Sequence, residues 1–257
     1  MWNDLQTGAY EGMIAETVSI PDQKGNTLPV YWSRPLGREQ YPSIVLIPHM
    51  PGWDEWCRET ARRFTQHGYG VMCPNIYHRA GEGTPSEVAK RSMEAGGQYD
   101  ADVMDDTKSC LDFLKMQKTS NGKVGVIGMC SGGRHAFMAA CLIEGFDAAV
   151  DCWGGGVVQA EESLKPQQPV SPHTYTEKLN IPLLGIFGND DKRPDVNEVN
   201  ALEEELKKYG KNYEFHRYDE AGHGIWYYDK PMYRQEAAMD SFNKTLDFFD
   251  RYLNTDE

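Results

Sequence analysis

The stretch Gly128-Met129-Cys130-Ser131-Gly132-Gly133 decides the fold of this chain of 257 residues. An apolar run over residues 123–127 comes before it and predicts a buried strand, and residues 134–140 after it predict the first turns of a helix. A strand, a sharp turn with a nucleophile at its tip and a helix together form a nucleophile elbow. The flanking glycines leave room for the turn, because side chains there would clash. The thiol at the tip therefore predicts an acyl-transfer hydrolase with Cys130 as its nucleophile.

Strand and helix patterns alternate around this elbow. Apolar strands are expected at 43–47, 69–73, 124–127, 148–152, 183–187 and 213–218, and amphipathic helices at 54–67, 99–116, 195–209 and 235–253. This alternation predicts the α/β class, with a mostly parallel central sheet and helices on both faces. An opening hairpin at 13–32 predicts an antiparallel N-terminal edge. Residues 79–97 are expected to form a loop or short helix over the carboxyl edge of the sheet, where ligands bind in such folds.

The composition is that of a single globular domain over residues 1–257, with 40% hydrophobic and 25% charged residues. The formal net charge of -13 argues against nucleic acid as a partner, because phosphate binding needs a basic surface. The chain begins without the pattern of a signal peptide, and no apolar run reaches the length of a membrane span. Its six cysteines are scattered, which favours a reducing compartment, and the cytoplasm is the expected location.

The base and the acid that a catalytic thiol needs are found at the ends of strands that follow Cys130 in the sequence. A thiol needs a base to become a thiolate, and the base needs an orienting acid, in the chain order nucleophile, acid, histidine. Asp190 and Asp191 follow one expected strand, and His223 follows the last. Asp191 is preferred because the orienting acid usually lies three residues past such a strand-end glycine, and Asp190 competes with it. Cys130, Asp191 and His223 are the predicted triad. The other histidines show no metal-binding spacing, so no metal is expected.

The predicted chemistry is hydrolysis through a thioester. Cys130 stands at a helix N-terminus, where the helix dipole and free N–H groups favour a thiolate. His223 takes the thiol proton, and the thiolate attacks the carbonyl of a small ester or lactone. The backbone N–H groups of Ser131 and Met50 are expected to form the oxyanion hole. Water then resolves the thioester without a cofactor. A monomer or small homo-oligomer is expected, with no nucleic-acid or membrane partner.

With these motifs in hand, the chain resembles the dienelactone hydrolase family. The resemblance runs from about Ile44 to the terminal helix. It rests on Gly-x-Cys-x-Gly-Gly at 128–133, on the segments around Asp191 and His223, and on Cys73-Pro74-Asn75-Ile76-Tyr77-His78-Arg79, which is similar to the family's C-P-D-L-Y-x-R. It implies a compact single-domain α/β-hydrolase that acts on esters or lactones. The reaction that names the family opens a dienelactone to maleylacetate.

Two departures from the family pattern concern substrate binding. The family's Glu beside the thiol is replaced by His49, which could hydrogen-bond the thiol or the substrate, or simply fill the pocket wall. Of the two arginines that hold the substrate carboxylate in the family, one matches Arg79 and the other is replaced by Tyr227. Because Trp53 and Trp226 are also near the active loops, we expect a more aromatic, less cationic pocket and a broad ester or lactone range.

Two other functions fit the same residues. The thiolate and oxyanion hole could serve another electrophile, such as a phosphotriester or an amide. A non-catalytic protein that binds ligands or senses oxidants through its thiol could use the same scaffold. A sensor has no need of Asp191 and His223 at strand ends, which favours the enzyme.

Overall fold

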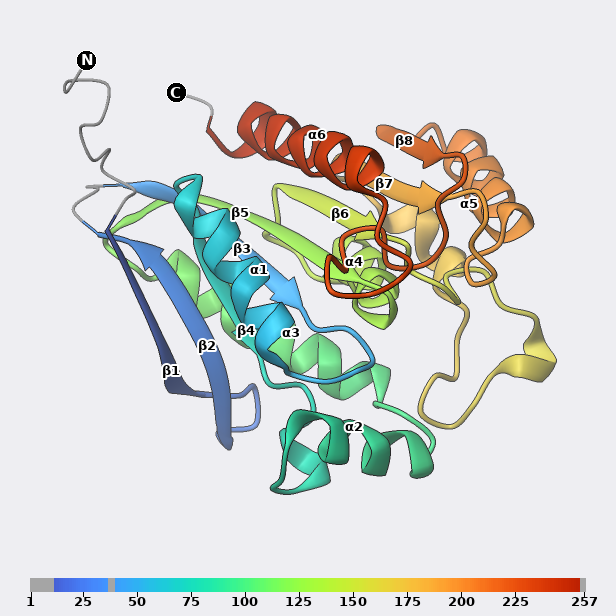
Figure 1. Cartoon of the computed structure of the whole chain (residues 1–257). Coiled ribbons are helices and arrows are strands. Elements are labelled where there is room, and N and C mark those ends of the chain that lie inside the picture. The colour runs from blue at the N-terminus through green and yellow to red at the C-terminus, as the bar shows by residue number, and fades with distance from the viewer. Residues whose placement is uncertain (1–11, 37–39, 255–257) are drawn as a thin grey trace, which may run out of the picture.

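An eight-stranded sheet forms the centre of the computed structural model, which describes residues 12–36 and 40–254 (Figure 1). The rest of the expected domain, at 1–11, 37–39 and 255–257, lies outside the described residues. In the described part the strand order is β1-β2-β4-β3-β5-β6-β7-β8. The strands are β1 (Met13–Pro21), β2 (Thr27–Pro35), β3 (Tyr41–Ile47), β4 (Gly70–Pro74), β5 (Ser120–Met129), β6 (Ala148–Cys152), β7 (Leu183–Gly188) and β8 (Tyr213–Tyr218).

The direction of the strands confirms the mostly parallel sheet with an antiparallel N-terminal edge. β2 pairs antiparallel with both of its neighbours, β1 and β4, while β4, β3, β5, β6, β7 and β8 pair parallel throughout. β3 and β5 lie side by side, with Ile47 opposite Gly128. The loop after β3 therefore begins beside the elbow, because the carboxyl ends of parallel strands meet at one edge of the sheet.

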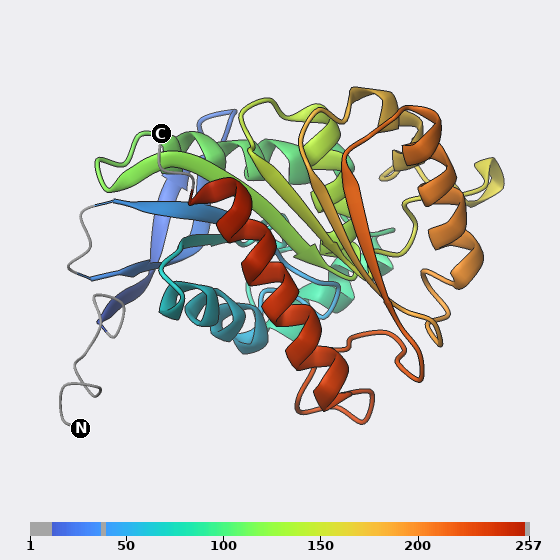
Figure 2. The ribbon, with the colours of Figure 1, turned by 90° about the horizontal axis from the view of Figure 1, so that it is seen from above.

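Helices cover both faces of the sheet, as expected (Figure 2). α1 (Glu55–Gln66) and α6 (Gln235–Leu253) lie on one face, and α3 (Asp100–Lys115), α4 (Ser131–Leu142) and α5 (Val196–Lys208) lie on the other. α2 (Pro85–Glu94) lies away from the sheet face, and short 3-10 helices occur at η2 (His78–Ala80), η3 (Glu161–Ser163) and η4 (Pro172–Lys178). The described residues contain no helix with the length and apolar character that crossing a bilayer demands.

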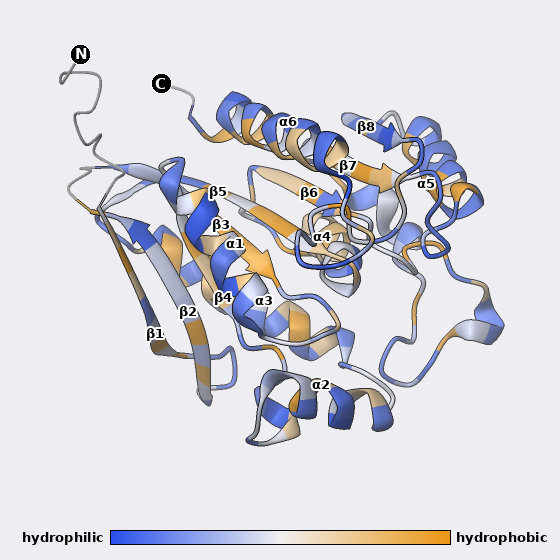
Figure 3. Ribbon diagram, viewed as in Figure 1, coloured by the Kyte–Doolittle hydropathy of each residue, from blue (hydrophilic) through white to orange (hydrophobic). Residues whose placement is uncertain are grey.

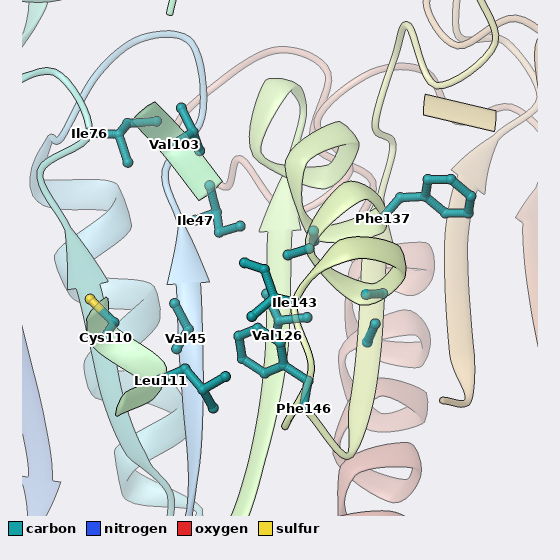
Figure 4. Close-up of a cluster of buried hydrophobic side chains, with 14 of the residues drawn as sticks. Val45, Ile47, Ile76, Val103, Cys110, Leu111, Val126, Phe137, Ile143 and Phe146 are labelled. Atoms are coloured by element: carbon teal, nitrogen blue, oxygen red, sulfur yellow. The ribbon is translucent and has the colours of Figure 1, made fainter. Parts of the chain in front are cut away.

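Alternate side chains of a central strand such as β3 pack into two separate hydrophobic cores, one on each face of the sheet. Val45 and Ile47 pack on the side of α3 and α4 (Figure 4), whereas Ile44 and Leu46 pack with α1 and α6. A strand with both faces buried has no polar alternation, which explains why residues 43–47 are apolar apart from Ser43. The hydrophilic residues lie mainly on the outer sides of helices such as α6 (Figure 3).

The segment expected as a loop or short helix contains α2. Thr84 caps this helix, its side chain and that of Glu87 each pairing with the other's backbone, and Pro85 stands in the first turn. Both features are typical of helix starts. The turn after α2 is tied to the long connection between β6 and β7, because the Gln167 side chain donates to the Ala95 carbonyl at 2.8 Å. These two connections flank the carboxyl edge of the sheet.

Candidate active site

The elbow has the geometry that its glycines predict. Cys130 stands between β5 and α4 with φ 57°, in the left-handed region that a non-glycine residue seldom adopts. A Cβ at Gly128 would lie 2.0 Å from the Gly132 carbonyl oxygen, and a Cβ at Gly132 would lie 2.2 Å from the Ile47 carbonyl oxygen. No side chain could occupy either position, so the close approach of β5, α4 and the end of β3 requires glycine there.

The structure brings Cys130, His223 and Asp191 together. The side chain of His223 interacts with the Cys130 sulfur, and its Nδ1 lies 2.8 Å from Oδ2 of Asp191. Cys130 follows β5, Asp191 follows β7, and His223 lies in the loop after β8. Asp191 is buried, whereas its neighbour Asp190 is exposed. The geometry therefore favours Asp191 over Asp190 as the partner of the imidazole.

Proton affinities in this group favour an ion pair. Burial raises the pKa of the Cys130 thiol, but its contacts with His223 and with two backbone N–H groups outweigh burial, so the pKa lies below its ordinary value. Burial lowers the pKa of His223, but Asp191 and Cys130 together raise it to about 10. A thiolate beside an imidazolium is the form that these shifts favour at neutral pH.

Both expected oxyanion donors face the sulfur. The backbone N–H groups of Ser131 and Met50 interact with the Cys130 sulfur and help to lower its pKa. Ser131 is the first residue of α4, and no side chain caps this helix, so its N–H remains available to a ligand. Met50 lies in the loop after β3, as expected.

A pocket of about 510 Å³ opens at these residues. Cys130, Ser131, Met50, Asp191 and His223 all line it. Further lining residues come from the turn after α2, from α4 and from the loops after β6 and β7: Met93, Gly96, Gly97, Arg134, Gly155, Gln159, Lys165, Gln168, Lys192 and Arg193. Sequence reasoning placed the 79–97 segment, which contains Met93, Gly96 and Gly97, over this edge of the sheet, but it missed the other lining residues. The rule that ligands bind beyond the carboxyl ends of strands could have pointed to the loops after β6 and β7.

The pocket is more cationic and less aromatic than expected. Arg134, Lys165, Lys192 and Arg193 contribute to its lining, and none of its lining residues is aromatic. Within residues 12–36 and 40–254, no ion pair involves Lys165, Lys192 or Arg193. These three cations can attract an anionic group, although Arg193 also interacts electrostatically with Glu198.

Arg79 does not line this pocket. Its guanidinium donates two hydrogen bonds of 2.8 Å to the buried carboxylate of Asp106 and lies 3.5 Å from Asp22. A buried carboxylate needs such a partner, because an unpaired charge is costly there. The expected substrate role of Arg79 is thus corrected to that of an ion-pair partner.

The four other expected binding residues also lie outside the lining. Trp53 donates to the Cys73 carbonyl at 3.0 Å, and Trp226 donates to the Ser241 hydroxyl at 2.7 Å. His49 and Tyr227 are buried and joined by a hydrogen bond of 2.6 Å between His49 Nδ1 and the Tyr227 hydroxyl. Aromatic residues near the active loops in sequence therefore pack inward, where they bury the most apolar surface.

One described cluster has the residue types of a metal site. Donor atoms of His49, Asp54 and Cys57 lie within 4.8 Å of one another. Asp54 Oδ2 is 3.0 Å from Nε2 of His49, so both ring nitrogens of this histidine already have protein partners. The cluster is separate from the pocket lining.

Comparison with known proteins agrees with this geometry. The family profile described as "Dienelactone hydrolase family" matches residues 28–253, most of the chain. The chain belongs to the dienelactone hydrolase family. As a member of this family it is a hydrolase with the α/β-hydrolase fold.

Relatives match over almost the whole length of this family member. A Methylorubrum extorquens protein named "Putative carboxymethylenebutenolidase" is 30% identical over 94% of this chain and 82% of its own length. The carboxymethylenebutenolidase of Pseudomonas putida is 29% identical over 92% of this chain and 96% of its own. A Klebsiella pneumoniae crystal structure named "Putative Dienelactone Hydrolase" superposes with a TM-score of 0.84 at 26% identity, covering 94% of this chain and all of that one.

Proposed function

We propose that this protein hydrolyses small carboxylic esters or lactones through a thioester on Cys130. The observation that carries the proposal is the contact of one sulfur with the His223 side chain and two backbone N–H groups at the edge of a pocket. A nucleophile, a base and two donors that converge on one point are the parts that acyl transfer requires. The carboxymethylenebutenolidases among its relatives support the same class of reaction.

The proposed reaction has two halves. The Cys130 thiolate forms a bond to the carbonyl carbon, and the carbonyl electrons move onto oxygen, where the Ser131 and Met50 N–H groups stabilise the charge. When the tetrahedral intermediate collapses, the bond to the leaving oxygen breaks and the imidazolium of His223 protonates that oxygen. His223 then takes a proton from water, which attacks the thioester and releases a carboxylic acid and the thiolate. Asp191 orients the ring in both halves.

The cationic lining supports a substrate that carries an anionic group. Lys165, Lys192 and Arg193 line the pocket that contains Cys130, and the acid in that lining, Asp191, is paired with His223. A carboxylate on the substrate would interact favourably with these three cations, and the planar guanidinium could bind it with two hydrogen bonds. This differs from the expectation of a less cationic pocket with a broad ester or lactone range.

The experiment compares an anionic lactone with a neutral p-nitrophenyl ester on the wild-type protein and on Cys130→Ala. We expect turnover of both by the wild-type protein, a higher kcat/KM for the anion, and no turnover by the variant. Brief mixing with the neutral ester followed by acid quench and mass spectrometry should detect the acyl group on Cys130. Turnover that survives in Cys130→Ala, or hydrolysis of a phosphotriester in place of both esters, would refute the proposal.

We also propose that the protein acts in a reducing compartment such as the cytoplasm, as a monomer or small homo-oligomer. All six cysteines are free thiols in the structure, and five of them are buried. Thiol titration after denaturation without reductant should count all six. A lower count in protein isolated under thiol-blocking conditions would contradict this location.

A further inference from the structure

The peptide group between His49 and Met50 has two distinct tasks on its two sides. Its N–H, on Met50, interacts with the Cys130 sulfur in the pocket that both residues line, where an oxyanion would form in the proposed reaction. Its carbonyl, on His49, accepts a hydrogen bond of 2.6 Å from the Tyr77 hydroxyl and one of 3.2 Å from the Gly52 N–H. Because a peptide group is planar, whatever holds the carbonyl also sets the direction of the N–H.

The side chain of the same residue is held from two further elements. His49 Nε2 lies 3.0 Å from Oδ2 of Asp54, the N-cap residue of α1, and Nδ1 lies 2.6 Å from the Tyr227 hydroxyl. Tyr227 stands four residues after His223, in the loop that holds the candidate base. The ring also stacks on Trp56 of α1, with the planes at 19° and the ring centres 5.1 Å apart. His49 therefore joins the oxyanion loop, the start of α1 and the loop of the catalytic histidine.

The ring is well suited to hold these contacts. The side chain of His49 is 3% exposed. Burial lowers its pKa, but its contacts with Cys57 and Asp54 raise it to about 9 overall, which favours a protonated ring that donates to the Asp54 carboxylate. A protonated donor to a carboxylate makes a stronger hydrogen bond than a neutral pair. The side chain contacts recorded for His49 are with Asp54, Cys57, Trp56 and Tyr227, and none is with Cys130.

We propose that His49 is a positioning residue, clamped by Asp54, Tyr227 and Tyr77, that aims the Met50 N–H at the oxyanion of the ester hydrolysis proposed above. It acts on the carbonyl oxygen of the reaction and leaves ionisation of the Cys130 thiol to His223. The inference rests on the proposed function, and it assigns a new role to four residues outside the pocket lining.

Two reactions at the same sulfur separate these roles. Ester hydrolysis passes through an oxyanion. Alkylation by iodoacetamide breaks a carbon–iodine bond and passes through no oxyanion. His49→Gln and Tyr227→Phe should each lower kcat for the p-nitrophenyl ester about 10- to 100-fold, somewhat less than loss of a complete oxyanion donor. We expect KM to change less than about threefold, and the rate of Cys130 alkylation at pH 7 to stay within about twofold.

A double variant and a matched control complete the experiment. His49→Gln combined with Tyr227→Phe should lower kcat no further than the worse single variant, because both remove the same contact. Tyr213→Phe, which removes a hydroxyl bonded to Glu203 at 3.1 Å near the other end of β8, should leave kcat unchanged. Tyr227→Phe removes a single oxygen atom, so it keeps the test valid where His49→Gln unfolds, as judged by circular dichroism.

Three results would overturn the inference while leaving the proposed function intact. Alkylation that slows in step with kcat would show that His49 acts on the thiol. An unchanged kcat in folded Tyr227→Phe would show that the hydrogen bond from Tyr227 to His49 is not needed to position the Met50 N–H. Independent, multiplicative losses in the double variant would show that the two residues act separately. Failure of the proposed function itself would instead appear as ester turnover that persists in Cys130→Ala.

Discussion

Two groups in this molecule contain the same three residue types. Cys130, His223 and Asp191 line the pocket, whereas Cys57, His49 and Asp54 lie at the start of α1 outside that lining. Each cysteine stands near the N-terminus of a helix, and each histidine contacts a carboxylate, at 2.8 Å in the first group and 3.0 Å in the second. Residue types and helix position are therefore not what distinguishes them.

The difference lies in access and in the backbone donors. Cys57 is 1% exposed, and burial raises the pKa of its thiol well above the ordinary value. The carboxylate of Asp54 accepts the Cys57 N–H at 3.0 Å, so the start of α1 is capped by its own chain. At the start of α4 no side chain caps, and the N–H of Ser131 faces the Cys130 sulfur. A helix N-terminus serves catalysis only where its donors are left for the substrate.

Replacing each cysteine by alanine should give the largest contrast between the two groups. Cys130→Ala should lower ester kcat/KM by about 10⁴-fold or more, because the nucleophile is lost. Cys57→Ala should lower it less than about threefold, since this sulfur touches no substrate. Steady-state kinetics on both variants measures the contrast. Comparable losses would mean that the buried group takes part in turnover.

Neutralising each acid should give the next largest contrast. Asp191→Asn should lower kcat about 10²- to 10³-fold, because the amide no longer holds the His223 ring or stabilises its positive charge. Asp54→Asn should cost about tenfold, through a looser His49. The same kinetics on the folded variants measures both effects. A larger loss of kcat in Asp54→Asn than in Asp191→Asn would show that Asp191 is not the orienting acid. Asp190→Asn serves as the control, because Asp190 is exposed.

The two thiols should also differ in their reaction with iodoacetamide. The pKa of Cys130 is lowered and that of Cys57 is raised, so at pH 7 the first thiol has the larger thiolate fraction. We expect Cys130 to be labelled at least about tenfold faster than Cys57, and His223→Ala to remove most of that advantage. Peptide mass spectrometry over a time course gives both rates. Faster labelling of Cys57 would invert the comparison.

The smallest predicted effect is on stability as a function of pH. The pKa of His49 is about 9 in the folded protein and 6.5 in the unfolded chain, so the folded state holds more protons between these values. Its contribution is complete below pH 6.5 and is lost as pH rises through 9, at about 1 kcal/mol between pH 7 and 8. Urea unfolding should show that His49→Gln loses correspondingly less stability over that interval. Parallel slopes for the two proteins would contradict the raised pKa.

Local sequence determined the arrangement of the candidate active site. The elbow depends on glycines at 128 and 132, and the spacing of Asp191 and His223 after their strands follows from the chain order of a parallel sheet. Each of these features is set by a few adjacent residues, so periodicity and turn chemistry were enough to locate them. The antiparallel edge and the helices on both faces followed from the same patterns.

The surroundings of that site depended on tertiary packing. Sequence proximity to the active loops suggested Trp53 and Trp226 as binding residues, and the family resemblance suggested Arg79. Each of the three has a buried or partly buried partner elsewhere. Of the cations that line the pocket, Lys165, Lys192 and Arg193 come from loops whose paths are set by contacts with other parts of the chain, such as Gln167 with Ala95. The direction in which a loop side chain points depends on the residues that pack against the loop, and those residues are distant in sequence.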